Sequence, residues 1–440
     1  MLKPTVNFRA EPGGSLRGEA RVPGDKSISH RSIMLGSIAE GVSHVTGFLD
    51  AEDCLATMNA FRAMGVKIVG PEEGRVTIHG VGLNGLKKAT APIDLGNSGT
   101  SMRLLSGLLA GQHFDTVLTG DNSLTRRPMK RVTEPLRRMG ARIETSESGT
   151  APLKIMGGNR LQGICYDMPV ASAQVKSCLL LAGLYAEGKT CVREPAPTRD
   201  HTERMLAGFG YPISREGERI CIHSGGMLKA TDIDVPSDIS SAAFFMVGAA
   251  IARDADVTLL HVGINPTRTG VIDILRLMGA NVELNNERVI GGEPVADVRV
   301  CSSELRGIDI PPHLVPLAID EFPALFVAAA CAAGETRLGG AEELRVKESD
   351  RIQVMADGLV ALGIDANPTL DGMVIRGGPF SGGSVDSHGD HRIAMAFSIA
   401  ALRAGGPITI GDCENVNTSF PTFLKLAQGL GLNIAVQSGR

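Results

Sequence analysis

The chain has 440 residues. A single hydrophobic core rarely supports a chain of this length, so we expect two domains. Hydrophobic residues make up 43% and charged residues 21%, as in an ordinary globular protein, while aromatic residues make up only 4%, which argues against a base-stacking platform. The net charge of -4 excludes a broadly basic surface for nucleic acid, so an anionic ligand would need locally gathered cations.

From the N-terminus onward, the first feature is an absence of targeting signals. The opening segment MLKPTVNFRAEPGG has no apolar core and no cleavage pattern, so we predict a cytoplasmic protein. The longest apolar runs, 242–252 and 322–333, are too short to span a bilayer. The eight cysteines show neither CxxC nor Cys/His metal spacing, so we expect small buried side chains in a reducing compartment and no metal.

Six segments along the chain share one pattern, in which a polar turn leads into an Ala/Leu-rich helix that usually ends at a glycine. Their starts recur about every 70 residues, which indicates a repeated multi-element unit. The Ala/Leu-rich composition predicts that each of these first helices is buried. In chain order the segments are 24–41, 96–111, 171–188, 237–254, 320–334 and 388–405.

A second helix is predicted after each first helix, and each ends at a glycine that is typical of a left-handed C-cap. β-like runs follow at 66–69, 142–144 and 281–284. The repeat therefore predicts an α/β fold of two similar lobes with three βαβαββ units each, divided near residues 235–236. The second helices are predicted at 54–64, 128–139, 200–209, 270–278, 350–362 and 421–430.

Polar residues cluster at the starts of the first helices. Helix N-termini bind phosphate or carboxylate through free backbone N–H groups. Capping alone explains a Ser, Asp or Asn there, but a Lys or Arg beside the positive helix end is unfavourable unless an anion is bound. The clusters are Lys26, Ser27 and Arg31; Asn97, Ser98 and Arg103; Ser172, Gln174 and Lys176; Asp320 and Glu321; and Asp390, His391 and Arg392.

Two connecting segments are also rich in charge. SLTRRPMKR at 123–131 places four cations in a loop that opens a helix, and LRVKESDRI at 344–352 places two carboxylates among cations. A solvated charged surface is one explanation of each segment. The other is chemistry on an anionic substrate, which needs an acid or base held among cations.

Eight segments, in order from residue 23 to 423, resemble the signature segments of the 5-enolpyruvylshikimate-3-phosphate (EPSP) synthase family, and SAQVKS resembles its class II branch. The family fold is an inside-out α/β barrel in two lobes, which implies lobes at 22–236 and at 237–440 with 1–21. The segments are PGDKSISHR (23–31), LGNSGTSMR (95–103), RRPMKR (126–131), SAQVKS (172–177), DEFPALF (320–326), RVKESDR (345–351), GDHRIAM (389–395) and TSFPTF (418–423).

The resemblance implies a role for each matching residue. Glu348 matches the proposed proton-transfer residue, and Lys26, Asp320 and Glu348 are the candidate catalytic residues for moving protons. The substrate-binding set that it implies is Lys26, Ser27, Arg31, Asn97, Gly99, Arg127, Ser172, Ala173, Gln174, Arg199, Asp320, Lys347, Arg351 and Arg392. Some members carry a lysine before the final Phe-Pro where this chain has Thr418-Ser419, which leaves open what supplies a further cation.

The activity implied by the resemblance is transfer of the enolpyruvyl group of phosphoenolpyruvate to the 5-hydroxyl of shikimate 3-phosphate. We expect a site between two closing lobes, with no cofactor, metal, nucleic acid or membrane partner, in a monomer. The family's herbicide, glyphosate, competes with phosphoenolpyruvate. Some class II relatives carry alanine at the position of Gly99, so the glycine predicts a pocket that accepts glyphosate.

Two alternative functions fit the sequence less well. The enolpyruvyl transferase that acts on UDP-N-acetylglucosamine carries Lys-Asn after the first glycine turn and a cysteine in a mobile loop, whereas Ser27 follows Lys26 here and no cysteine lies between 54 and 165. A repeat-built clamp for nucleic acid should be basic overall, whereas this chain has a net charge of -4.

Overall fold

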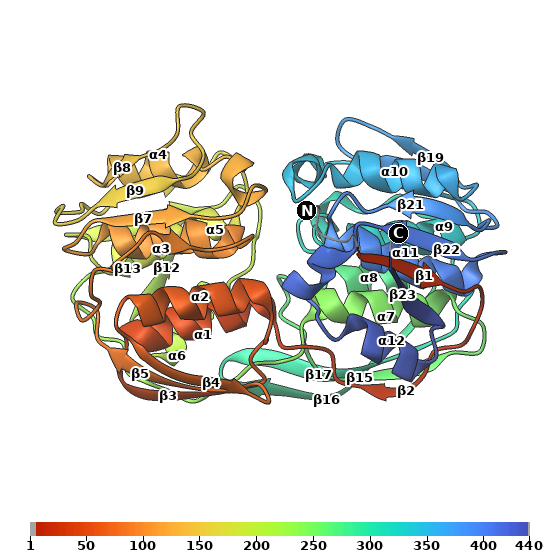
Figure 1. Cartoon of the computed structure of the whole chain (residues 1–440), viewed down its shortest axis with the longest axis horizontal. Helices are drawn as coiled ribbons and strands as arrows, with labels where there is room; N and C mark the ends of the chain where they lie inside the picture. The colour runs from red at the N-terminus through yellow and green to blue at the C-terminus, as the bar shows by residue number, and fades with distance from the viewer. Residues whose placement is uncertain (1–5, 439–440) are drawn as a thin grey trace. The chain divides into compact units, whose positions relative to one another are not determined.

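The structure is a computed structural model that describes residues 6–438 (Figure 1). The described residues form two compact units. The first unit comprises Gly24–Val235 and Ile290–Glu293, and the second comprises the described residues up to Pro23, Pro236–Val289 and those from Pro294 onward. We propose that these units are the lobes that the sequence predicts at 22–236 and at 237–440 with 1–21.

The first unit holds three four-stranded sheets with strand orders β14-β3-β5-β4, β6-β7-β9-β8 and β10-β11-β13-β12. Its strands are β3 (Glu40–Thr46), β4 (Lys67–Glu72), β5 (Arg75–Val81), β6 (Ile93–Asp94), β7 (Thr116–Thr119), β8 (Arg142–Glu144), β9 (Leu153–Met156), β10 (Cys165–Asp167), β11 (Lys189–Arg193), β12 (Ile213–Glu216), β13 (Arg219–His223) and β14 (Ile233–Asp234). Its helices are α1 (Lys26–Ile38), α2 (Glu52–Ala63), α3 (Gly99–Ala110), α4 (Lys130–Arg138), α5 (Ala173–Gly183) and α6 (His201–Gly208), with a 3₁₀ turn η1 (Leu124–Arg126).

The second unit repeats this plan with sheets β16-β17-β15-β2, β18-β20-β19 and β21-β22-β1-β23. Its strands are β1 (Val6–Ala10), β2 (Arg17–Ala20), β15 (Asp256–Gly263), β16 (Asn281–Ile290), β17 (Glu293–Cys301), β18 (Glu335–Leu338), β19 (Asp365–Pro368), β20 (Met373–Arg376), β21 (Gly383–Asp386), β22 (Ile408–Gly411) and β23 (Ile434–Ser438). Its helices are α7 (Ile239–Ile251), α8 (Gly270–Leu277), α9 (Phe322–Cys331), α10 (Arg351–Ala361), α11 (His391–Ala400) and α12 (Phe423–Leu430), and its 3₁₀ turns are η2 (Pro312–Leu314), η3 (Glu342–Val346), η4 (Ala401–Arg403) and η5 (Glu414–Thr418).

The six predicted first helices are present as α1, α3, α5, α7, α9 and α11, and they form the interior of each unit. Every residue of α7 is buried, as are nearly all residues of α3 and α9. In the first unit α3 packs against α1 and α5, and in the second unit α7, α9 and α11 pack against one another. Figure 1 shows α1 and α2 lying over the sheet that contains β3, β4 and β5. The prediction of buried first helices is confirmed.

The six predicted second helices are present as well, and each ends at the predicted glycine. All six glycines have positive φ angles, from 77° to 112°. A residue with a Cβ is strained in that conformation, so glycine at these positions ends the helix and lets the chain turn into the following strand. The glycines are Gly65, Gly140, Gly210, Gly279, Gly363 and Gly431.

The expectation that every cysteine is a small buried side chain is wrong. Cys165 is exposed, and Cys191 and Cys221 form a disulfide. These two are directly paired residues of the antiparallel strands β11 and β13, and sequence spacing does not reveal such register. Within residues 6–438, no helix is both long and apolar enough to cross a membrane.

Candidate functional site

In the first unit the predicted site begins at the start of α1. Asp25 caps the helix by accepting a hydrogen bond from the Ile28 amide at 2.9 Å. Lys26, the first helical residue, forms an ion pair with Asp53 of α2, whose side chain is buried. The ion pair offsets the unfavourable placement of a lysine at the positive end of a helix.

Arg31 lies one turn further along α1 and is buried. Its Nε donates to Thr202 Oγ1 at 2.7 Å, its Nη2 to Ser177 Oγ at 2.7 Å and its Nη1 to the Ser27 carbonyl at 2.9 Å. Burial lowers the pKa of Arg31 to about 10, so the guanidinium is still charged at neutral pH. Arg31 thus joins α1 to α5 and α6, and Arg199 Nη1 approaches Ser27 Oγ at 3.5 Å.

The start of α3 carries the second group of predicted residues. Ser98 caps this helix, and Gly99 is its first residue. Asn97 Oδ1 accepts from Arg127 Nη2 at 2.6 Å, while its amide donates to Asp121 at 2.8 Å. A Cβ added to Gly99 would lie 3.2 Å from Arg127 Nη1 and 3.0 Å from Arg103 Nη1. Gly99 does not have a positive φ, so the space beside two guanidinium groups, and not an unusual backbone angle, distinguishes the glycine.

The start of α5 completes this group. Ser172 caps the helix by accepting from the Val175 amide at 3.4 Å, and Ala173 is its first residue. Gln174 Oε1 accepts from Arg103 Nη1 at 2.7 Å. Arg103 therefore joins α3 to α5 as Arg31 joins α1 to α5. Three helix N-termini and several cations converge in the first unit, an arrangement suited to anionic groups.

In the second unit the predicted residues surround Arg351, the first residue of α10, which is 1% exposed. Its Nε donates to Asp390 Oδ2 at 2.8 Å, its Nη2 to Glu348 Oε2 at 2.6 Å and its Nη1 to Asp320 Oδ1 at 3.4 Å. Burial alone would lower the pKa of Arg351, but the carboxylates raise it above its usual value. Burial would likewise raise the pKa of Asp390, but Arg351 outweighs burial and lowers it.

Lys347 and Arg392 also contact Asp320. Lys347 Nζ lies 3.4 Å from Asp320 Oδ1 and donates to Glu343 at 3.0 Å. Arg392 Nη1 donates to the Asp320 carbonyl at 3.0 Å. The start of α9 is thus linked to the starts of α10 and α11, and Asp390 caps α11. Carboxylates are interleaved with the cations of this group, as Asp53 is paired with Lys26 in the first unit.

The structure brings the predicted residues together in two groups, one in each unit. Lys26, Ser27, Arg31, Asn97, Gly99, Arg127, Ser172, Ala173, Gln174 and Arg199 belong to the first, and Asp320, Lys347, Glu348, Arg351 and Arg392 to the second. At the position where some family members carry lysine, Ser419 Oγ lies 3.2 Å from His391 Nε2, at the start of α11.

Sequence reasoning missed several charged residues beside these groups, among them two that are buried. Asp53 is one, because its contact with Lys26 joins two helices and leaves no local sequence signal. The other is Arg268, which is buried and donates to Ser240 Oγ at 2.6 Å at the start of α7. A signal for Arg268 exists in the repeat, because Pro-Thr-Arg precedes both α6 at 197–199 and α8 at 266–268.

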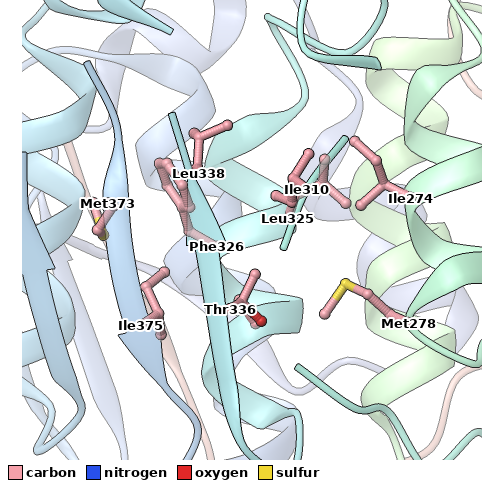
Figure 2. A pocket seen from close by; sticks show the side chains of 10 residues that line it. Ile274, Met278, Ile310, Leu325, Phe326, Thr336, Leu338, Met373 and Ile375 are labelled. Atoms are coloured by element: carbon pink, nitrogen blue, oxygen red, sulfur yellow. The ribbon is translucent and has the colours of Figure 1, made fainter. Parts of the chain in front are cut away.

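A small apolar cavity in the second unit contains none of the predicted residues. Figure 2 shows Ile274, Met278, Phe326 and Ile375 around it, with Thr336 as its polar member. Such a lining has no charged group to hold an anion, so this cavity is not a candidate site for an anionic substrate.

Comparison with known proteins identifies relatives over nearly the whole chain. The family model described as EPSP synthase (3-phosphoshikimate 1-carboxyvinyltransferase) matches residues 10–426. The chain is 76% identical over 431 residues to a 3-phosphoshikimate 1-carboxyvinyltransferase of Methylococcus capsulatus, covering 98% of this chain and 99% of that protein. It is 68% identical to one of Alkalilimnicola ehrlichii, covering 97% and 96%.

Solved structures show the same similarity. An EPSP synthase from Acinetobacter baumannii is 62% identical with a TM-score of 0.90, covering 99% of this chain and 100% of that one. The enolpyruvyl transferase NikO from Streptomyces tendae is only 18% identical but has a TM-score of 0.83, covering 99% and 100%, and supports the fold alone. The predicted fold class is confirmed.

Proposed function

The chain belongs to the EPSP synthase family, and from this we infer that it transfers the enolpyruvyl group of phosphoenolpyruvate to the 5-hydroxyl of shikimate 3-phosphate, releasing phosphate. The observation that carries this inference is 76% identity, over 98% of the chain, to a 3-phosphoshikimate 1-carboxyvinyltransferase. The reaction gives 5-enolpyruvylshikimate 3-phosphate.

A phosphate-release assay tests this function directly. We expect phosphate release that requires both phosphoenolpyruvate and shikimate 3-phosphate. The matched control replaces shikimate 3-phosphate with UDP-N-acetylglucosamine, and we expect no phosphate from it. The assignment would be overturned if phosphoenolpyruvate released phosphate with UDP-N-acetylglucosamine but not with shikimate 3-phosphate. Release of phosphate without either acceptor would overturn it as well.

For the first unit we propose a role in holding the anionic groups of the substrates. Lys26, Ser27 and Arg31 would hold both substrates, including the carboxylate of shikimate 3-phosphate. Ser172, Ala173, Gln174 and Arg199 would bind its phosphate and ring, while Asn97, Gly99 and Arg127 would line the phosphoenolpyruvate pocket. The convergence of three helix N-termini with Arg31, Arg103 and Arg127 supports this role, because each contributes positive potential.

For the second unit we propose a role in proton transfer and in binding phosphoenolpyruvate. Asp320 and Lys347 would contact the hydroxyls of shikimate 3-phosphate, and Arg351 and Arg392 would face phosphoenolpyruvate. Glu348 would transfer a proton, and its bond to Arg351 supports this by fixing the orientation of its carboxyl group. We propose that the residues of both units act on the same pair of substrates.

The proposed chemistry is addition followed by elimination. The 5-hydroxyl oxygen attacks C2 of phosphoenolpyruvate as it loses its proton, and C3 gains a proton to become a methyl group. The tetrahedral intermediate then expels phosphate while the methyl group returns a proton. Lys26, Asp320 and Glu348 are the proposed proton carriers, and the cations stabilise charge on the carboxylate and the departing phosphate.

The setting of the reaction is also part of the proposal. We propose a cytoplasmic monomer that acts without metal, organic cofactor, nucleic acid or membrane. The net charge of -4 supports the absence of a nucleic-acid surface. Sedimentation equilibrium on the purified chain tests the monomer, and a mass twice that of the 46.2 kDa chain would contradict it.

A further inference from the structure

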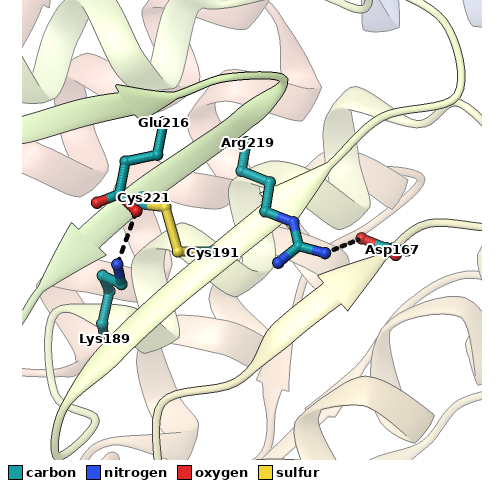
Figure 3. Close-up of a disulfide and its surroundings, with 6 residues drawn as sticks. All are labelled: Asp167, Lys189, Cys191, Glu216, Arg219 and Cys221. Carbon is teal, nitrogen blue, oxygen red and sulfur yellow. Dashed lines mark hydrogen bonds and ion pairs between the residues drawn. A yellow bond between two sulfur atoms is a disulfide. The ribbon is translucent and has the colours of Figure 1, made fainter.

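Three cysteines lie in one row across a sheet of the first unit. Cys191 on the central strand β11 is directly paired with Cys165 on the parallel strand β10 and with Cys221 on the antiparallel strand β13. Directly paired residues project from the same face of a sheet. Cys191 and Cys221 are bonded, with Cα atoms 4.2 Å apart (Figure 3). The middle sulfur therefore has a bonded cysteine on one side and a free cysteine on the other.

The three sulfurs differ in their access to solvent. Cys191 and Cys221 are 2% and 0% exposed, whereas Cys165 on the edge strand is exposed. Figure 3 shows Lys189 and Glu216 next to the bridge, joined by a 2.7 Å ion pair. A dissolved thiol can thus reach Cys165 more easily than either bonded sulfur.

We propose that Cys165, Cys191 and Cys221 form a thiol–disulfide exchange site whose reaction partners are small thiols and dithiols. Neighbouring strands are about 4.7–4.9 Å apart, and disulfides form across Cα separations of about 4.4–6.8 Å. A Cys165–Cys191 bridge therefore fits the existing strand pairing without moving the sheet. Cys191 is the sulfur common to both bridges.

The exchange step is balanced within the protein. The Cys165 thiolate attacks Cys191 Sγ, a new Cys165–Cys191 bond forms, and the Cys191–Cys221 bond breaks. The electron pair goes to Cys221 Sγ, which takes up the proton that Cys165 lost. The bridge now includes an exposed sulfur.

An external thiol completes the reduction. It attacks Cys165 Sγ, which gives a mixed disulfide and a Cys191 thiol. A second external thiol then attacks the mixed disulfide, which restores the Cys165 thiol and releases the oxidised small molecule. Two small thiols are oxidised for each protein disulfide reduced.

A metal site is the competing use of these side chains. With the bridge reduced, Cys191, Cys221 and Glu216 would offer three ligand atoms that lie within 4.8 Å of one another. However, the Lys189 ammonium group already binds the Glu216 carboxylate, and Arg193 and Arg219 stand on the same strand face two residues from the cysteines. The Glu216 carboxylate that would complete a metal site is thus already neutralised by Lys189, and Arg193 and Arg219 are themselves paired with Asp167. The row is therefore better suited to exchange than to holding a metal ion.

The first test compares rates of reduction by glutathione. The full chain is purified without reductant, treated with glutathione and quenched with N-ethylmaleimide, and the Cys191–Cys221 bridge is quantified by mass spectrometry. We expect Cys165→Ser to slow the reduction about tenfold or more, since access controls exchange rates. Cys301→Ser, in the second unit, is the matched control and should reduce at the wild-type rate. Equal rates for Cys165→Ser and wild type would overturn the proposal, as would wild-type protein that contains no bridge.

The second test examines the alternative bridge. In Cys221→Ser, diamide should oxidise Cys165 and Cys191 to a disulfide, taking up two electrons and two protons. Cys221→Ala serves the same purpose if a buried hydroxyl disturbs the sheet. A Cys165–Cys191 cross-linked peptide is the expected result. If Cys165 and Cys191 of a folded variant still react fully with N-ethylmaleimide after diamide treatment, no bridge has formed between them. The strand register then does not permit exchange, and the proposal fails.

Discussion

The ion pair between Lys26 and Asp53 changes what is expected of a lysine at a helix start. From the helix dipole alone, removal of this lysine should not destabilise the protein. Asp53, however, is 6% exposed, and its Oδ1 has no hydrogen-bond partner among the described residues. The lysine therefore neutralises a buried carboxylate, in addition to its proposed role in binding the substrates.

We accordingly expect Lys26→Met to abolish turnover and also to lower the free energy of unfolding by about 1–3 kcal/mol, because a buried charge is left unpaired. The double variant Lys26→Met with Asp53→Asn should recover stability but not activity. Phosphate release and urea unfolding check the two effects separately. A single variant as stable as wild type would show that the ion pair contributes nothing to folding.

Gly99 is expected to control selectivity between two anions. A methyl group at this position would lie close to the guanidinium groups of Arg103 and Arg127, so it should exclude a longer ligand more than a shorter one. We expect Gly99→Ala to raise the inhibition constant of glyphosate far more than the KM for phosphoenolpyruvate. Gly429→Ala, where an added Cβ meets nothing within 4 Å, is the control. Equal weakening of both ligands would refute a selective clash.

Glu348 and Glu343 provide a matched pair of carboxylates. Glu348 binds Arg351, while Glu343 binds Lys347 from the preceding 3₁₀ turn. We expect Glu348→Gln to lower kcat about 100-fold or more with a smaller change in KM, as for loss of a general acid or base. Glu343→Gln should change kcat little. An unchanged kcat in Glu348→Gln would remove this residue from the mechanism.

At the scale of elements, the repeat predicted the twelve α-helices of residues 6–438 and the glycines that end the six second helices, because apolar composition and C-cap chemistry are local properties of the sequence. The strands that complete a sheet from a distant part of the chain were not predictable in this way. β14 completes the sheet of β3, and β2 completes the sheet of β15, through pairings between segments far apart in the chain. The same limitation hid the cysteine row and the Lys26–Asp53 contact. The site residues were proposed from the family motifs, and they stay a prediction.

Strand β18 offers a test of core packing. Thr336 is buried, and its hydroxyl has no hydrogen-bond partner among the described residues. Thr336→Val keeps the shape and removes the unpaired hydroxyl, so we expect a gain of about 1 kcal/mol in the free energy of unfolding. In the control Thr418→Val, the removed hydroxyl is one that donates to the Asn415 carbonyl at 2.7 Å. We therefore expect this variant to lose about 1 kcal/mol of the free energy of unfolding. Urea unfolding midpoints that move the other way would contradict both assignments.

At the scale of the whole molecule, the proposed site draws on both units. Lys26 and Ser172 belong to the first unit, and Asp320 and Lys347 belong to the second. If one molecule of shikimate 3-phosphate binds all of them, it should restrict the motion of one unit against the other.

We therefore expect shikimate 3-phosphate to reduce the radius of gyration measured by small-angle scattering. Inorganic phosphate at the same concentration is the control for a general effect of anions and should leave the radius unchanged. An identical radius with and without shikimate 3-phosphate would argue against closure.

The pairing of β1 has a consequence for the order in which the molecule is made. β1 leaves the ribosome before the other described strands, yet its partners are β22 and β23, some four hundred residues later. At about 5–20 residues per second, β1 waits roughly 20–80 seconds for them. Most of the first unit, from Gly24 to Val235, emerges meanwhile and can fold. The unit that contains the earliest strands is consequently the last to be completed, and its unpaired strand edge is exposed to aggregation for the whole of synthesis.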